Sequence, residues 1–261
     1  MAQLRRLPVA WGLALAVLVT LLVPKTAAQT KTTAPFTDPA TNITFQRFFG
    51  AKSQFAFSIA LPTTPTNSFI GQLSFPLSNG AGWGGFSLTG DMEGPLLLAA
   101  WSDGTTVVSS FRQAANEDDN PPEVTGTFRL RPIAAGTSVN GSSLTYTFLC
   151  EGCLDATLGL GPAATGGTAE MGWASASTAV RNPGSSAGVL GFHNSGFGDF
   201  EANLAAARSA EFEAWAVLAG APVVASTGAV PIKPNAADDE EDSDDEKDDE
   251  KDDEDDDEED D

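Results

Sequence analysis

Short runs in which apolar residues alternate with polar or small ones dominate the middle of this 261-residue chain. The run 55–61 places Phe, Phe, Ile and Leu at alternate positions, and the run 144–148 does the same with Leu, Tyr and Phe. Glycine, proline, asparagine and aspartate separate the runs. A period of two is the mark of a half-buried strand, so the pattern predicts an all-β chain.

Eight strands are expected between residues 36 and 179. They cover residues 55–61, 69–77, 83–88, 96–101, 105–111, 127–133, 144–150 and 170–176. Many short strands with frequent turns are typical of an antiparallel β-sandwich. One helix is expected near the C-terminal end, over residues 203–218, where alanines accompany a rough apolar stripe. No internal repeat is evident.

The N-terminal segment has the composition of a secretory leader. Arg5 and Arg6 precede a run of about 15 apolar residues, which is short for a bilayer-spanning helix, and small residues follow up to Ala28. Residues 1–28 are therefore predicted to be a signal peptide that is removed near Ala28. We expect a secreted, extracellular protein without a membrane anchor.

The C-terminal segment is almost purely acidic. Residues 238–261 contain 21 acidic residues and two lysines, and contribute −19 to the net charge of −22. Such a segment buries nothing and repels itself, so we expect a disordered tail, either as a solubilising segment or as a polyanionic arm. Residues 29–220 are expected to form the domain and residues 221–237 an irregular linker.

The remaining charge argues against nucleic-acid binding. The part between leader and tail carries about −6, whereas phosphate contacts need clustered lysine and arginine. The sequence also lacks a nucleophile elbow, a phosphate-binding loop, a dinucleotide fingerprint and an assignable pair of carboxylates for glycoside hydrolysis.

The two cysteines and two glycosylation motifs fit an exported protein. Cys150 and Cys153 are expected to form one local disulfide in an oxidising compartment, although a redox-active pair has the same spacing. A zinc site lacks ligands. Asn42 and Asn140 each begin an Asn-X-Ser/Thr motif and are predicted glycosylation sites.

Two ligand-type residues remain without an evident structural role. His193, the only histidine, lies in a glycine-rich segment, and Met92 lies in a turn between two expected strands. Met171 shares an alternating strand face with Trp173 and is expected in the core, whereas the flanks of Met92 offer no core face. Imidazole and thioether are a recognised axial pair for haem iron. A surface histidine and a surface methionine are the alternative interpretation.

At these residues the sequence resembles the haem-binding cytochrome domain of fungal cellobiose dehydrogenases, a member of the DOMON-like family. The matching segments, in order, are residues 36–39, 69–71, 90–101, 107–112, 150–153 and 193–200. Segment 90–101 resembles the family's methionine-ligand turn and the strand after it, segment 150–153 its local disulfide, and segment 193–200 its histidine-ligand loop. The resemblance extends over about residues 34–216.

The resemblance implies an immunoglobulin-like sandwich holding one non-covalent haem b, with Met92 and His193 as the axial iron ligands. Five aromatic residues are implied as possible walls of the haem pocket: Trp83, Phe86, Trp101, Phe192 and Phe197. Where the family has a tyrosine that helps to hold a haem propionate, this chain has Gln113. Position 113 is therefore a departure within the expected cofactor site.

The resemblance also implies electron transfer rather than substrate turnover. No flavin dehydrogenase domain follows residue 234 in this sequence, so we expect a monomeric electron carrier rather than an enzyme. By analogy its partners are a separate flavin dehydrogenase as donor and an acceptor such as a copper polysaccharide monooxygenase. The alternative is a haem-free module that binds carbohydrate or another ligand, with Trp83 or Trp101 stacked on a sugar.

Overall fold

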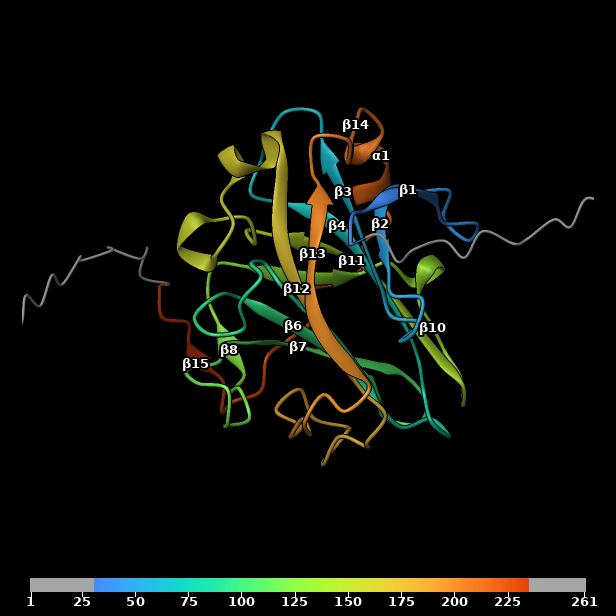
Figure 1. Ribbon diagram of the computed structural model, residues 1–261, viewed down its shortest axis with the longest axis vertical. Coiled ribbons are helices and arrows are strands. Elements are labelled where there is room, and N and C mark those ends of the chain that lie inside the picture. The colour runs from blue at the N-terminus through green and yellow to red at the C-terminus, as the bar shows by residue number, and fades with distance from the viewer. Residues whose placement is uncertain (1–30, 235–261) are drawn as a thin grey trace, which may run out of the picture. The chain divides into compact units, whose positions relative to one another are not determined.

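The computed structural model describes residues 31–234, which form a β-sandwich with one short helix (Figure 1). The larger sheet contains β1 (Ala34–Thr37), β2 (Thr44–Phe49), β3 (Ala56–Pro62), β4 (Phe69–Pro76), β9 (Arg129–Pro132), β10 (Ser138–Val139), β11 (Ser143–Glu151) and β14 (Arg208–Ser209). The smaller sheet contains β5 (Trp83–Ser87), β6 (Leu97–Ser102), β7 (Val107–Arg112), β12 (Thr168–Ala176) and β13 (Gly196–Asn203). This architecture confirms the expected fold class.

Pairing within both sheets is antiparallel apart from one short contact. The larger sheet runs β1-β2-β3-β4-β11-β10, with β9 also paired to β11, and the smaller one runs β13-β12-β5-β6-β7. β14 adds two residues in parallel to β3. A separate two-residue parallel pair joins β8 (Val124–Thr125) to β15 (Val230–Pro231).

Phenylalanine side chains fill the space between the sheets. Phe57 of β3 stacks on Phe86 of β5 with ring centroids 4.2 Å apart, and Phe48 of β2 stacks on Phe200 of β13 at 4.5 Å. Full burial of such a side chain contributes roughly 1.5–3 kcal/mol, and stacking adds to it. Met171 of β12 is fully buried among them, as expected from the alternation.

The eight expected strands are all present, but the sequence interpretation missed β1, β2 and β13, together with the two-residue strands β8, β10, β14 and β15. The predicted helix over residues 203–218 is wrong for most of its length, because β13 continues to Asn203 and β14 pairs with β3 at Leu61. Only α1 (Phe212–Ala216) is helical, and Phe212 anchors it in a second apolar cluster beside the larger sheet. The segment between Leu154 and β12 contains two 3-10 turns, η2 (Ala156–Leu158) and η3 (Pro162–Gly166); η1 (Ala134–Gly136) follows β9.

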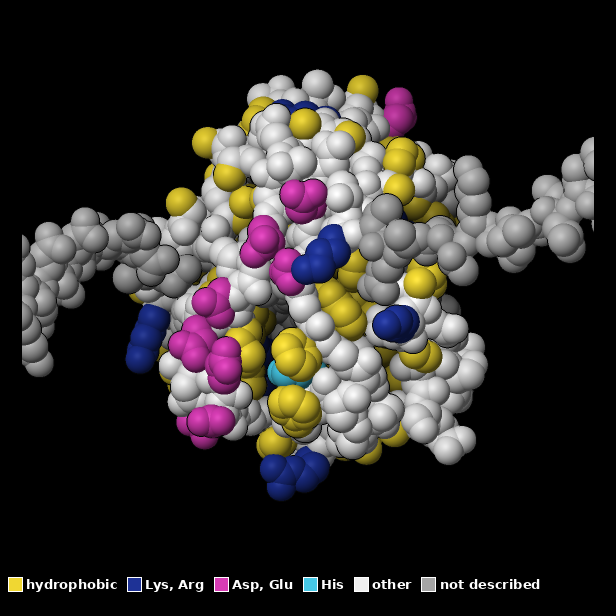
Figure 2. Space-filling view, viewed as in Figure 1, with side chains coloured by type: hydrophobic (Ala, Val, Ile, Leu, Met, Phe, Trp, Pro, Cys, Tyr) yellow, Lys and Arg dark blue, Asp and Glu magenta, His cyan; other side chains and the backbone are white. Residues whose placement is uncertain are grey.

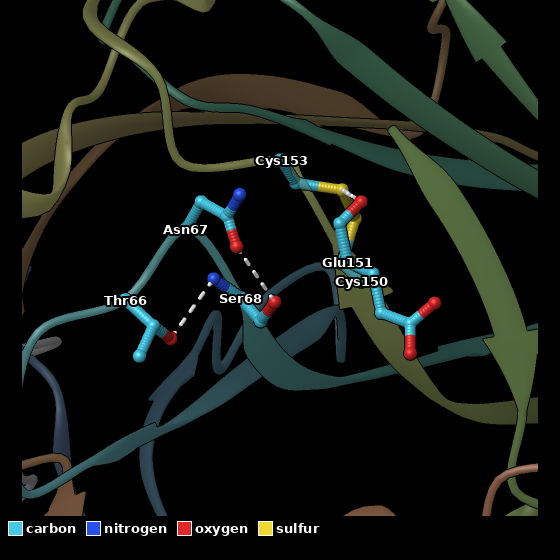
Figure 3. The surroundings of a disulfide bond; sticks show 6 residues. All are labelled: Thr66, Asn67, Ser68, Cys150, Glu151 and Cys153. Atoms are coloured by element: carbon cyan, nitrogen blue, oxygen red, sulfur yellow. Dashed lines mark hydrogen bonds between the residues drawn. A yellow bond between two sulfur atoms is a disulfide. The ribbon is translucent and has the colours of Figure 1, made fainter. Parts of the chain in front are cut away.

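Cys150 and Cys153 form the expected disulfide at the end of β11 (Figure 3). The backbone N–H of Leu154 donates to the carbonyl of Asn67 at 2.9 Å, so the bridged segment lies against the loop that precedes β4. A bridge that closes so short a loop removes little chain entropy, and it secures a strand end rather than the whole fold.

The predicted terminal segments and glycosylation sites can be compared with the described residues. Residues 221–234, expected to belong to a linker, contribute β15 and hydrogen-bond to the sandwich, whereas the expected leader and acidic tail lie outside the described residues. Asn42 and Asn140 lie in exposed turns, and their glycosylation stays a prediction. Within residues 31–234 we find no helix of the length and apolarity needed to cross a membrane.

The hairpin between β6 and β7 generates the first testable expectation. Backbone N–H groups of Thr106 and Thr105 donate to the Asp103 carboxylate at 2.7 and 2.8 Å and, with both hydroxyls, hold its pKa well below the ordinary value. Because the Asp103 carboxyl has a lower pKa in the folded state than in the unfolded state, its ionised form stabilises the fold above about pH 4. This stabilisation is lost as the pH falls. We expect Asp103→Asn to lower the free energy of unfolding at pH 6 and to do so much less at pH 2–3.

Urea denaturation at both pH values measures this difference, with Glu213→Gln on the exposed face of α1 as the control. An equal loss of stability at pH 6 and pH 2–3 for Asp103→Asn would show that the carboxylate charge is not what the turn uses.

Candidate functional site

A crevice of about 580 Å³ opens on the outer face of the five-stranded sheet. Its volume lies within the range of small-molecule and cofactor sites. Its walls come from the β5–β6 turn, the loop after β7 and the loop that leads into β13. The crevice brings together residues that lie about a hundred positions apart in the chain.

The floor of the crevice consists of residues with little or no side chain. The strand register places Ala174 of β12 beside Gly85 of β5, and Gly85 beside Ala99 of β6. Gly172 and Ser87 are paired in the next outward-facing row. Because successive residues of a strand point to opposite faces, the aromatic residues between these positions fill the core. The outer face is left shallow and flat, and a planar ligand can approach the backbone there.

Met92 lines one side of this crevice and is half-buried. Its turn is held on the β5 side, where the Ser87 hydroxyl donates to the Asp91 carbonyl at 2.5 Å. On the β7 side the backbone N–H of Gly94 donates to the Ala114 carbonyl at 3.0 Å. The backbone on one side of Met92 is thus fixed to β5, and the backbone on the other side to the segment that follows β7.

His193 lines the same crevice and is half-buried. Its ring lies between the rings of Phe192 and Phe197, with centroids 4.3 and 4.4 Å away. Burial lowers the pKa of His193, while the charge of Glu117 acts in the opposite direction. Burial thus favours the neutral imidazole, which is the form that binds metals.

The loop that carries His193 is anchored at several points. The indole N–H of Trp83 donates to the Gly191 carbonyl at 3.0 Å, and the side-chain carbonyl of Asn194 accepts from the backbone N–H of Ser177 at 3.0 Å. The Nδ1 atom of His193 is buried without a hydrogen-bond partner among the described residues.

The expected aromatic walls divide into three groups. Trp83 lines the crevice, and Phe86 lines it while its ring packs in the core. Phe192 and Phe197 line it from the mouth and are 72% and 63% exposed. Trp101 lies outside the lining, fully buried beneath the loop after β12, where its indole N–H donates to the Pro183 carbonyl. Since Trp83 and Trp101 are both buried, neither offers an open indole face for stacking on a sugar.

Gln113 also lies outside the crevice lining. Its side-chain amide donates to the Gly94 carbonyl at 2.6 Å and to the Lys233 carbonyl at 2.7 Å. The residue therefore contacts the backbone beside the Met92 turn and the C-terminal segment.

Arg112 is the one cationic side chain that lines the crevice, and sequence reasoning missed it. Only 1% of it is exposed, and its guanidinium donates to the carbonyls of Pro121, Ser186 and Gly188 and to the Ser110 hydroxyl. Burial lowers its pKa to about 10, while the charge of Glu123 raises it, so the group stays charged at neutral pH.

Five acidic residues contribute to the lining of the crevice: Asp91, Glu117, Asp118, Glu170 and Asp199. Figure 2 shows acidic side chains gathered on one side of the hollow that contains the histidine. No three His, Cys, Asp or Glu side chains converge into a metal-binding group anywhere in residues 31–234.

The small residues of the floor were also not predicted from the sequence. The sequence did contain a signal for these residues. Gly85 is next to Phe86 in β5, and Ala99 is next to Leu98 in β6, so in each strand the small residue and the large one point to opposite faces. A strand that is apolar on one face and side-chain-poor on the other indicates a close approach to that second face.

Comparison with known proteins identifies similar domains. A sequence profile of the family described as "Cytochrome domain of cellobiose dehydrogenase" matches residues 36–214. The chain is 34% identical over 145 residues to a pyrroloquinoline quinone-dependent pyranose dehydrogenase of Coprinopsis cinerea, a match that covers 54% of this chain and 19% of that relative. The chain therefore spans about a fifth of the relative's length.

Two solved structures share the fold. The cytochrome domain of Myriococcum thermophilum cellobiose dehydrogenase has a TM-score of 0.66 and 30% identity, covering 75% of this chain and 100% of that chain. The cytochrome b domain of pyranose dehydrogenase from Coprinopsis cinerea has a TM-score of 0.65 and 28% identity, covering 74% of this chain and 100% of that chain. These matches confirm the resemblance and the sandwich.

Arg112 generates the second expectation. Replacing it with methionine leaves the carbonyls of Pro121, Ser186 and Gly188 without their donor. The loop after β7 and the loop before β13 then lose their hydrogen bonds to this strand. We expect Arg112→Met to lower the free energy of unfolding by about 3 kcal/mol or more. The same change at exposed Arg129 should alter it by less than about 0.5 kcal/mol. Denaturant titration of the two variants measures the contrast, and equal stabilities would exclude this role for Arg112.

Proposed function

Because the chain belongs to the family of the cytochrome domain of cellobiose dehydrogenase, we propose that it is a b-type cytochrome that transfers electrons. The observation that carries the proposal is the shared crevice of Met92 and His193. A thioether and an imidazole are the axial pair of many electron-transfer haems, and the thioether raises the reduction potential.

The residues of the crevice fit a haem. A planar porphyrin needs a flat apolar slot, and the Gly and Ala floor between aromatic walls supplies one. The propionates of haem b are anionic, and Arg112 is a buried cation in the lining. The imidazole of His193 lines the crevice, and its lowered pKa favours the neutral form, which binds metals.

Met92 and His193 would hold the haem between them, and a haem held in this way would supply one-electron transfer without binding oxygen. The role of the protein is to hold both ligands in place and to exclude water from the slot.

We also propose where the protein works and with what. The leader-like segment and the disulfide support an extracellular location. The proposed donor is a sugar-oxidising dehydrogenase, because the two relatives with similar cytochrome domains are dehydrogenases. The proposed acceptor is a copper polysaccharide monooxygenase, by analogy with the family.

The ligand assignment is tested by absorption spectroscopy. We expect the purified, haem-supplemented protein to show a low-spin haem spectrum that dithionite changes to the ferrous form. Met92→Ala and His193→Ala should each abolish the six-coordinate spectrum, whereas Met171→Leu in the core should keep it. A folded wild-type protein that takes up no haem contradicts the proposal.

The location of the haem is tested by filling the slot. Ala174→Phe places a ring over the floor of the crevice, and we expect at least a tenfold loss of haem affinity because the macrocycle no longer fits. Ala205→Phe, at an exposed position after β13, is the matched control. Titration of the haem-free variants with haem measures both, and equal affinities would place the haem elsewhere.

A further inference from the structure

The C-terminal residues 220–233, which we name the C-terminal strap, are hydrogen-bonded along the sandwich. The backbone N–H of Gly220 donates to the Pro132 carbonyl and that of Val223 to the Leu130 carbonyl, both at 2.8 Å. Further along, the backbone N–H of Ile232 donates to the Thr125 carbonyl at 2.9 Å. The strap is thus tied to the core domain at both of its ends.

Side chains add to this attachment. The buried carboxylate of Glu123 accepts from the backbone N–H and the hydroxyl of Ser226. Arg131 donates from its guanidinium to the carbonyls of Gly220 and Ala219, at 2.8 and 2.9 Å. The path of the strap is therefore fixed before it reaches its last residue, Lys233.

Gln113 joins the end of the strap to the turn that carries Met92. Its Nε2 donates to the Gly94 carbonyl at 2.6 Å and to the Lys233 carbonyl at 2.7 Å. Its Oε1 accepts from the backbone N–H of Lys233 at 2.9 Å. Both amide protons and the amide oxygen have backbone partners, so this half-buried side chain is fully engaged.

The position of this bridge is directly relevant to Met92. Gly94 is two residues from Met92, and its carbonyl has Gln113 as donor while its N–H is bonded to Ala114. The Gln113 bridge therefore holds the side of the turn that the Ser87 contact does not reach.

We propose that Gln113 is a positioning residue that couples the C-terminal strap to the Met92 turn and keeps the thioether in place as a haem ligand. The proposal rests on the proposed cytochrome function, since it concerns the ligand of that haem. It gives position 113 a role through the backbone of the turn, and it makes the strap a part of the site.

The coupling is tested by how readily Met92 leaves the iron. Carbon monoxide binds ferrous haem only after an axial ligand departs, so its binding rate reports the looseness of that ligand. Gln113→Glu keeps the size and the acceptor for Lys233 but sets a carboxylate against two carbonyl oxygens. Lys233→Pro removes the N–H that donates to Gln113 and leaves the crevice unchanged. We expect both variants to bind carbon monoxide about tenfold faster than the wild type.

Two controls separate this effect from general destabilisation. Gln46→Glu makes the same chemical change on β2, where the side chain donates to the Ala206 carbonyl instead. Deletion of residues 238–261 removes the acidic segment and keeps the strap. Both should bind carbon monoxide at the wild-type rate.

Hydrogen exchange of the peptides that cover residues 91–94 and 230–233 gives a readout that needs no haem. Gln113→Glu should accelerate exchange in both peptides, whereas Gln46→Glu should accelerate neither. Wild-type exchange and carbon monoxide rates in the Gln113 variant overturn the inference and leave the cytochrome assignment intact. A wild-type protein without haem defeats the proposed function instead, and exchange still decides whether the turn and strap are coupled.

Discussion

The packing of the two sheets through phenylalanine rings is the constraint on which the rest of the structure depends. Pairs such as Phe57–Phe86 and Phe48–Phe200, together with buried Met171, commit one face of β5, β12 and β13 to the interior. The strand period then assigns every second residue of those strands to the outside. The glycines and alanines at these outer positions make the flat floor of the crevice, so the core and the site are two consequences of one register.

The flat outer face of the sheet becomes a crevice only because loops form walls along it. Arg112 supplies that connection through hydrogen bonds to the loop after β7 and to the loop before β13. Its burial would be costly for an unpaired cation, and its four hydrogen bonds and nearby Glu123 compensate for this cost. The same residue therefore stabilises the walls and leaves a positive charge within the crevice, which suits an anionic cofactor.

The sequence was most informative where side-chain periodicity decides the structure. All eight expected strands formed, because alternation in runs such as 55–61 reports burial directly. The helix expected over residues 203–218 mostly did not form, because the preference of alanine for helices is weak compared with strand pairing at Arg208. β13 was missed because its glycines and exposed Phe197 disguise the alternation.

The candidate ligands were found from the sequence because they are rare, a single histidine and a methionine in a polar turn. Arg112 was not found, because a buried arginine inside a strand has the same sequence appearance as an exposed one at its end. Only the three-dimensional arrangement shows that carbonyls from distant loops surround it.

The C-terminal strap illustrates a further limit of sequence-based interpretation. Residues 221–234 lack periodicity, since they are held mainly through backbone groups that every residue except proline possesses. The sequence marks Gln113 only as a departure from the family's tyrosine, and its bridging contacts arise where the fold brings Gly94 and Lys233 together. A side-chain amide suits that place because it donates two hydrogen bonds and accepts one without adding charge. An aspartate there would leave the carbonyls of Gly94 and Lys233 without a donor, and a lysine would leave the N–H of Lys233 without an acceptor.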